Sequence, residues 1–178
     1  MTIEKQRRVA IISLHTSPLA QPGVGDSGGM NVYVREMASA LAQQGTECVV
    51  YTRADAADLP REVVVEPGHR VIYVQAGPHH LPKEALTDII DEFTEAVIDD
   101  IEARGGVDAV HAHYWLSGEV GHALKHRFDV PLIVTFHTLA RVKGAGGDLE
   151  PGYREAAEAA QIGCADAVCV SCDAERSE

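Results

Sequence analysis

The sequence predicts an α/β fold organised around a doubly wound, mostly parallel β-sheet. Short apolar runs alternate along the chain with longer segments in which apolar residues recur at helical spacing, the pattern of βα units. The first run, Arg8–Leu14, is unbroken, as expected for a strand that helices cover on both faces. The 178 residues are enough for one domain with its own core, and we expect a Rossmann-like arrangement.

The first half of the chain is expected to form one helix and three further strands. A glycine-rich stretch at residues 23–29 leads directly into a helical pattern at 29–44, which stops at Gly45. Pro67-Gly68 separates two short apolar runs and predicts a hairpin or an irregular sheet edge. The strands expected after the helix are 47–52, 62–66 and 70–75.

The second half continues the alternation of helices and strands. A long amphipathic helix is expected at 84–104, and it ends at a pair of glycines. The elements expected after it are strands 107–111, 130–136 and 167–171, helices 116–127 and 151–162, and a helix that begins at residue 172. Because the chain stops soon after a complete strand, we expect residues 1–178 to be a single domain of a longer, truncated protein.

Composition excludes several classes of partner. The formal net charge of -12 argues against nucleic acid and against anionic membrane surfaces, because both require a basic face. No apolar run approaches the length of a membrane span, and the first eight residues lack the apolar core of a signal peptide. We therefore expect a cytoplasmic protein without a membrane span.

The glycine-rich stretch indicates an anion site, because glycines and the first N–H groups of a helix let a phosphate approach the backbone. Gly23, Gly25 and Gly28 also have the spacing of a dinucleotide fingerprint. Eight residues, 15–22, separate the first strand from this loop, which disfavours a dinucleotide. An NAD(P)-dependent oxidoreductase domain, with Arg53 on a 2′-phosphate, and a glycine-rich turn that binds nothing stay as alternatives.

Polar residues follow the predicted strands, where open parallel sheets bind their ligands. The loops at 15–30, 76–83, 111–116 and 137–143 are expected to meet on one side of the sheet and carry most of the nine histidines. Four cations on or next to these loops suggest an anionic ligand, the alternative being ordinary solvated charges. They are Lys83, Arg141, Lys143 and Arg154.

Two patterns suggest a metal, but we predict none. His111-x-His113 could supply two ligands, although no nearby acid completes a site. Cys164, Cys169 and Cys172 have the spacing of three ligands in a plant-type iron–sulfur site. Because Cys169 lies in an expected buried strand, we favour cysteines that act as small apolar residues.

Three motifs, in this order, resemble those of family 4 retaining glycosyltransferases of the GT-B fold. The motifs are Asp26–Val34 (DSGGMNVYV), His111–Gly118 (HAHYWLSG) and His137–Lys143 (HTLARVK). The resemblance runs from about residue 8 to 173. It is strongest to the inositol-phosphate N-acetylglucosaminyltransferases of mycothiol synthesis and weaker to sucrose-phosphate synthases.

The resemblance implies that this chain is the N-terminal, acceptor-side domain and that a C-terminal donor domain is missing, so that the chain alone is inactive. The implied reaction moves a sugar from a nucleotide diphosphate sugar, as co-substrate, to a sugar phosphate or inositol phosphate with retained anomeric configuration. No cofactor and no protein nucleophile are implied, because the leaving phosphate is thought to help deprotonate the acceptor. A non-catalytic sugar-phosphate-binding domain stays as an alternative.

The resemblance also implies residue roles. Gly28 and Gly29 would contact the donor diphosphate, and His137 would lie against the donor sugar as the catalytic residue. The implied acceptor-binding residues are His15, Asn31, Lys83, Tyr114, Thr138, Lys143 and Arg154. Phe136 and Arg141 differ from the residues of the mycothiol enzymes at these positions. The third motif is more similar to that of sucrose-phosphate synthases. The acceptor therefore stays open between inositol phosphate, a hexose phosphate and another polyol.

Overall fold

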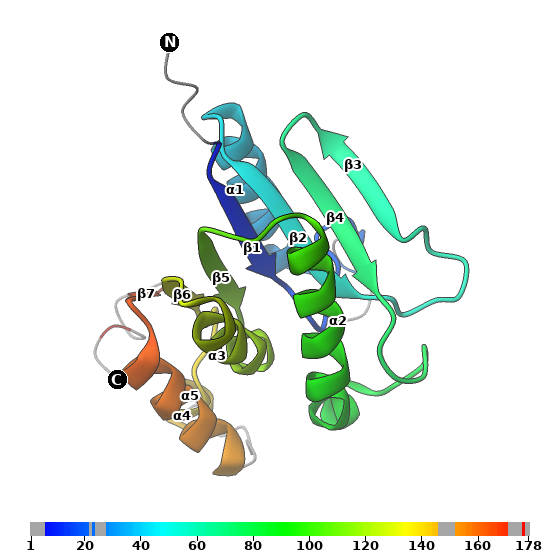
Figure 1. Ribbon diagram of the computed structural model, residues 1–178. Helices are drawn as coiled ribbons and strands as arrows, with labels where there is room; N and C mark the ends of the chain where they lie inside the picture. The colour runs from blue at the N-terminus through cyan, green and yellow to red at the C-terminus, as the bar shows by residue number, and fades with distance from the viewer. Residues whose placement is uncertain (1–5, 22, 24–27, 146–151, 171–175, 177–178) are drawn as a thin grey trace.

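A seven-stranded sheet forms the centre of the computed structural model, which describes residues 6–21, 23, 28–145, 152–170 and 176 (Figure 1). Five neighbouring strand pairs are parallel, and only the edge strand β3 runs antiparallel to its neighbour β4. In spatial order the strands are β3 (Glu62–Glu66), β4 (His69–Val74), β2 (Glu47–Arg53), β1 (Arg8–Ile12), β5 (Ala109–His113), β6 (Leu132–Thr135) and β7 (Ala167–Cys169).

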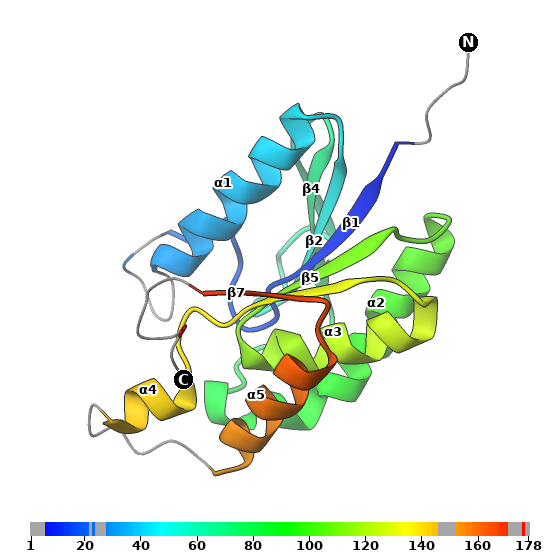
Figure 2. The same ribbon diagram turned by 90° about the vertical axis from the view of Figure 1, so that its left-hand side faces the viewer.

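Helices cover both faces of the sheet, with α1 on one face and α2, α3 and α5 on the other (Figure 2). The helical elements are α1 (Gly29–Gln43), the 3₁₀ helix η1 (Lys83–Ile89), α2 (Ile90–Ala103), α3 (Trp115–Phe128), α4 (Ala140–Ala145) and α5 (Gly152–Cys164). The doubly wound α/β fold is therefore confirmed. None of the helices in the described ranges has the length and apolar character to cross a membrane. The cytoplasmic location stays a prediction.

Two apolar clusters sandwich the sheet. Ile12, Phe93 and Leu124 belong to the cluster under α2 and α3, whereas Ile11 and Val34 belong to the cluster under α1. Neighbouring residues of β1 thus point to opposite faces of the sheet. Both faces are buried at this strand, which explains why its sequence is continuously apolar.

Several element boundaries differ from the prediction. The strand expected at 107–111 lies at Ala109–His113, because β5 starts where Ala109 pairs with Val9 of β1. The start of the helix expected at 84–104 is 3₁₀, and its buried residues Leu86 and Ile89 are three apart, the spacing of one 3₁₀ turn. The loop expected at 137–143 contains the start of α4.

The expectation that Cys169 is buried is wrong. It lies in β7, whose three residues are all exposed, and Val168 keeps 39% of its accessible surface. Among the described strands β7 has one neighbour, β6, and it forms an edge of the sheet. The strand pattern was recognised correctly, but a strand at an edge need not be covered.

Candidate functional site

The ring of Tyr114 is the centre around which three other predicted site residues gather. Tyr114 follows β5 with a positive φ of 74°, and its N–H donates to the Thr135 carbonyl at 2.8 Å. Lys83 Nζ and the Arg154 guanidinium carbon each lie 5.0 Å from the ring centroid. The His15 ring lies at 4.6 Å. Segments far apart in the sequence therefore place two cations and an imidazole around one aromatic ring, a cation–π arrangement.

Arg154 is a fixed cation rather than a mobile surface charge. Its side chain is 1% exposed, and its Nε donates to the Glu158 carboxylate at 2.8 Å. Its Nη2 donates to the carbonyl and the hydroxyl of Thr138 at 2.7 and 3.2 Å. The other Glu158 oxygen accepts the Ala140 N–H at 2.8 Å. This pair joins α5 to the segment after β6 and orients the guanidinium beside Tyr114.

His15 is held neutral in this site. Burial, followed by the positive charge of Lys83, lowers the pKa of His15 to about 3. Its buried Nδ1 has no hydrogen-bond partner among the described residues. A neutral imidazole can donate from one nitrogen and accept at the other, so His15 offers a polar contact to a ligand without adding charge.

A second group of imidazoles lies behind His137. His137 follows β6 with a φ of 64°, and its Nε2 is hydrogen-bonded to His113 Nδ1 at 3.0 Å. His111 and His113 both belong to β5, and their rings are 4.2 Å apart on the same side of the strand. His111 Nε2 is hydrogen-bonded to the Thr135 hydroxyl at 2.9 Å. The histidines of β5 are therefore buried supports for His137.

The protonation of these supports is coupled to folding. Burial and the nearby His137 lower the pKa of His111 to about 4, and burial lowers the pKa of His113 well below its usual value. The unfolded chain binds these protons at about pH 6.5. The neutral forms therefore stabilise the fold above pH 6.5, and this stability is lost as the pH falls toward 4.

We expect the free energy of unfolding to fall between pH 6.5 and pH 5, by up to about 1.4 kcal/mol per pH unit for each such histidine. His111→Gln removes one titrating group and keeps a polar partner for Thr135. Urea unfolding at several pH values should then show a shallower fall for the variant. An unchanged slope would mean that His111 does not carry this dependence.

Asn31 ties Gly28, directly before α1, to the segment after β1. Its side chain is 1% exposed and donates to the Thr16 hydroxyl at 2.6 Å and to the Ser17 carbonyl at 2.5 Å. Its Oδ1 accepts the Gly28 N–H at 3.0 Å. A Cβ atom at Gly28 or Gly29 would meet none of the described residues within 4 Å. The described part of the chain thus leaves space at the start of α1, where the helix dipole is positive.

The remaining cations behave differently from Lys83 and Arg154. Arg141 forms an exposed ion pair with Glu155 at 2.6 Å, so its alternative interpretation as a solvated charge fits best. Lys143 lies half-buried in α4. Arg53 is 8% exposed, and its guanidinium donates to the carbonyls of residues 54, 78 and 79. These bonds argue against Arg53 as a contact for a 2′-phosphate.

Residues 28–178 match the family described as Glycosyl transferase 4-like domain. The chain belongs to this glycosyltransferase family. The predicted family and the fold class of GT-B glycosyltransferases are thereby confirmed.

Named relatives agree with this assignment. The glycosyltransferase domain is 47% identical over 171 residues to a D-inositol 3-phosphate glycosyltransferase of Xylanimonas cellulosilytica, a match that covers 92% of this chain and 41% of that protein. It is 51% identical over 161 residues to the protein of the same name from Geodermatophilus obscurus, covering 88% of this chain and 35% of the relative. The chain thus spans about two fifths or less of these relatives.

A solved structure with the same fold is sucrose-phosphate synthase from Thermosynechococcus elongatus. The TM-score is 0.91 at 33% identity, over 97% of this chain and 44% of the synthase chain. Both relationships named from the motifs, to inositol-phosphate transferases and to sucrose-phosphate synthases, are therefore found.

The sequence did not reveal every residue of this candidate site. Tyr33, on the first turns of α1, places its ring edge-on at 5.4 Å from His137 and 5.9 Å from His113. Tyr33 is 45% exposed. An aromatic residue in the first turns of a helix that follows a glycine-rich stretch was the available signal.

Proposed function

We propose that this chain is the acceptor-side domain of a retaining glycosyltransferase that moves a sugar from a nucleotide diphosphate sugar to a phosphorylated polyol or sugar. An inositol phosphate is the acceptor we favour. The observation that carries the proposal is the pair of cations, Lys83 and Arg154, placed on the Tyr114 ring at the carboxyl end of the sheet. The names of the relatives, D-inositol 3-phosphate glycosyltransferase, support the choice of acceptor.

The chemistry of the Tyr114 site suits a phosphate bound to a polyol. Lys83 and Arg154 supply positive charge, and charge-assisted hydrogen bonds to phosphate are among the stronger polar contacts. The hydroxyl groups of Tyr114 and Thr138 and the neutral ring of His15 supply further polar contacts for phosphate or polyol oxygens. Asn31, which orders the loop beside this site, would act mainly by holding it in place.

The donor would lie at the start of α1. Gly28 and Gly29 let a diphosphate approach the positive end of the helix. The ring of Tyr33, on the same helix, contacts the ring of His137. In the proposed reaction the bond between the sugar and the diphosphate breaks and the acceptor oxygen bonds to the sugar carbon. The acceptor's proton passes to the leaving phosphate oxygen. A second domain in the longer protein would supply the other donor contacts.

We expect Lys83→Ala, in the longer protein that carries this chain, to raise the KM for inositol phosphate about 10- to 100-fold with little change in kcat. A charge-assisted hydrogen bond contributes roughly 1.5–3 kcal/mol, and the bond would be lost from bound acceptor and transition state alike. Steady-state kinetics with inositol phosphate as the varied substrate measure the effect.

Two controls make this test specific. Arg61→Ala removes an exposed cation next to β3, at the far edge of the sheet, and should leave the acceptor KM unchanged. Unphosphorylated inositol should be used equally poorly by the wild type and by Lys83→Ala. An unchanged KM for inositol phosphate would contradict the phosphate site. Tight binding of inositol phosphate without any sugar transfer would favour the non-catalytic alternative.

A further inference from the structure

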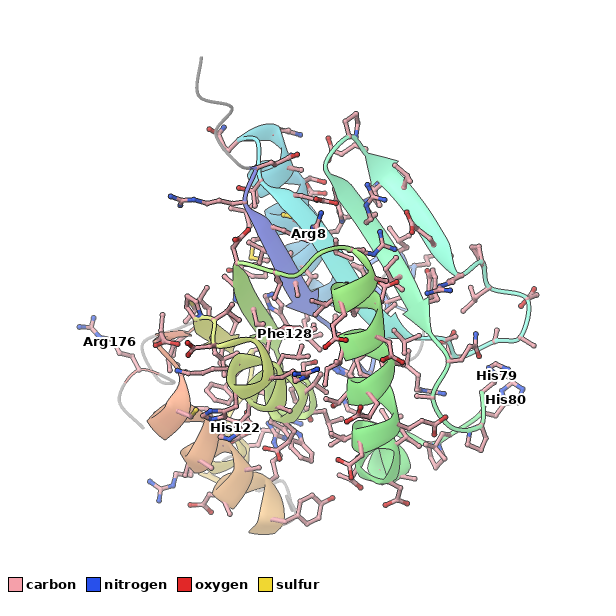
Figure 3. All side chains as sticks on the ribbon, viewed as in Figure 1. Arg8, His79, His80, His122, Phe128 and Arg176 are labelled. Atoms are coloured by element: carbon pink, nitrogen blue, oxygen red, sulfur yellow. The ribbon has the colours of Figure 1, made fainter. Side chains whose placement is uncertain are left out.

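Two histidines and a cysteine gather between α3 and α5, away from the Tyr114 site. They are His122 and His126 of α3 and Cys164, the last residue of α5. One ligand atom from each of them lies within 4.8 Å of the others. His122 is labelled in Figure 3 at this end of the molecule, opposite His79 and His80. We propose that these three side chains form a binding site for Zn²⁺ or a similar borderline transition-metal ion.

The geometry of the cluster is close to that of a metal site. Residues four apart on a helix share one face, and the rings of His122 and His126 lie 4.7 Å apart. Cys164 Sγ lies 3.5 Å from His126 Nε2. Tetrahedral zinc, with bonds of about 2.3 Å to sulfur and about 2.0 Å to nitrogen, separates these atoms by about 3.5 Å. One edge of the coordination tetrahedron therefore has its metal-bound length.

The ligand set determines which ion fits. One thiolate and two neutral imidazoles favour zinc, copper or cobalt over magnesium or calcium, which prefer oxygen ligands. On binding, the Cys164 thiol would lose its proton to solvent and form the metal–sulfur bond, and a water molecule would fill the fourth position. His126 is exposed and the other two ligands are half-buried, so an ion can enter from solvent.

A neighbouring side chain supports Cys164. Lys125 Nζ donates to the Cys164 carbonyl and to the Asp166 carboxylate, both at 2.7 Å. These bonds fix the end of α5 against α3.

The position of the cluster indicates a structural or regulatory role. Arg154 stands ten residues before Cys164 on α5, about 15 Å along the helix axis. The metal would join α3 and α5 at the ends opposite those that carry Trp115 and Arg154, and so would not touch the reacting groups. It would stabilise the packing that positions Arg154, because an ion that binds only the folded chain raises its stability by mass action.

Titration of the chain with Co²⁺, a spectroscopic substitute for Zn²⁺, tests the proposal. We expect one equivalent of Co²⁺ to give a near-ultraviolet thiolate-to-cobalt charge-transfer band and the intense visible bands of tetrahedral cobalt. One equivalent of Zn²⁺ should displace the cobalt and raise the unfolding temperature. A spectrum without the charge-transfer band would overturn the site and leave only a hydrogen bond between Cys164 and His126.

Matched variants identify the ligands. Cys164→Ser should abolish the charge-transfer band, whereas Cys169→Ser, which changes an exposed cysteine of β7, should leave it intact. His126→Ala should weaken Zn²⁺ binding tenfold or more, whereas His80→Ala, which removes another exposed imidazole, should not. Both ligand variants change accessible side chains, and circular dichroism confirms that they fold. A band that survives Cys164→Ser, or equal effects of His126→Ala and His80→Ala, would overturn the proposal.

Discussion

Replacing Arg154 with alanine is expected to destabilise the domain by about 3–5 kcal/mol and to abolish binding of the acceptor phosphate. The alanine leaves the Glu158 carboxylate, 4% exposed, as a buried charge without its 2.8 Å partner. It also removes the two hydrogen bonds that hold Thr138 beside α5. Urea unfolding monitored by circular dichroism measures the first effect, and calorimetric titration with inositol phosphate measures the second.

A paired variant separates stability from binding. Arg154→Met combined with Glu158→Gln removes both charges, and the glutamine oxygen still accepts the Ala140 N–H. Because no unpaired charge is buried, the double variant should recover most of the lost stability. It should still fail to bind the acceptor phosphate. Wild-type stability of Arg154→Ala would show that the ion pair does not stabilise the fold, and wild-type phosphate affinity of the double variant would remove Arg154 from the site.

Local patterns were sufficient for most of the fold. The unbroken apolar strands and the amphipathic helices identify a covered parallel sheet, and Pro67-Gly68 marks the hairpin of β3 and β4. The prediction errors occur where the structure depends on how strands pair or on which strands are covered by other elements. The start of β5 depends on its register with β1. The exposure of Cys169 depends on the position of β7 at the edge of the described sheet. Neither is encoded in the local sequence.

The site was predictable in its location but not in its internal contacts. The rule that loops after parallel strands meet on one side brought His15, Tyr114 and Arg154 together correctly. The hydrogen bond between His113 and His137 joins two strands, so no sequence spacing reveals it. Burial was equally hidden, because the sequence does not show whether Asn31, at the start of α1, contacts a ligand or ties the helix start to a neighbouring loop.

Gly118→Ala is expected to destabilise the domain by about 4 kcal/mol, through a clash between α3 and α5. A Cβ atom at Gly118 would overlap Gln161 Oε1 and lie 2.9 Å from Gln161 Nε2. Gln161 is fully buried, and its Nε2 donates to the Trp115 carbonyl at 2.9 Å and to Glu119 at 2.6 Å. The amide cannot move away from the new methyl group without breaking these bonds and leaving buried polar groups unpaired. Denaturant unfolding measures the loss.

Gly163→Ala is the matched control for this prediction. Gly163 lies on α5, and a Cβ atom there would meet nothing within 4 Å. Alanine is the better helix former by about 1 kcal/mol, so this variant should be as stable as the wild type or slightly more stable. The free energy of unfolding should fall in Gly118→Ala and stay the same or rise in Gly163→Ala. This contrast distinguishes the clash from a general effect of glycine replacement on the helices.

A double variant, Gly118→Ala with Gln161→Ala, identifies the cause. Truncating Gln161 alone loses its hydrogen bonds and opens a space beside α3, and the methyl group introduced by Gly118→Ala would occupy part of that space. The double variant should therefore be more stable than the sum of the single effects predicts, by about 2 kcal/mol. Strict additivity would contradict the clash. The same contact spaces the helices that carry Trp115 and Arg154, so acceptor affinity should weaken in Gly118→Ala even under conditions in which the variant is fully folded.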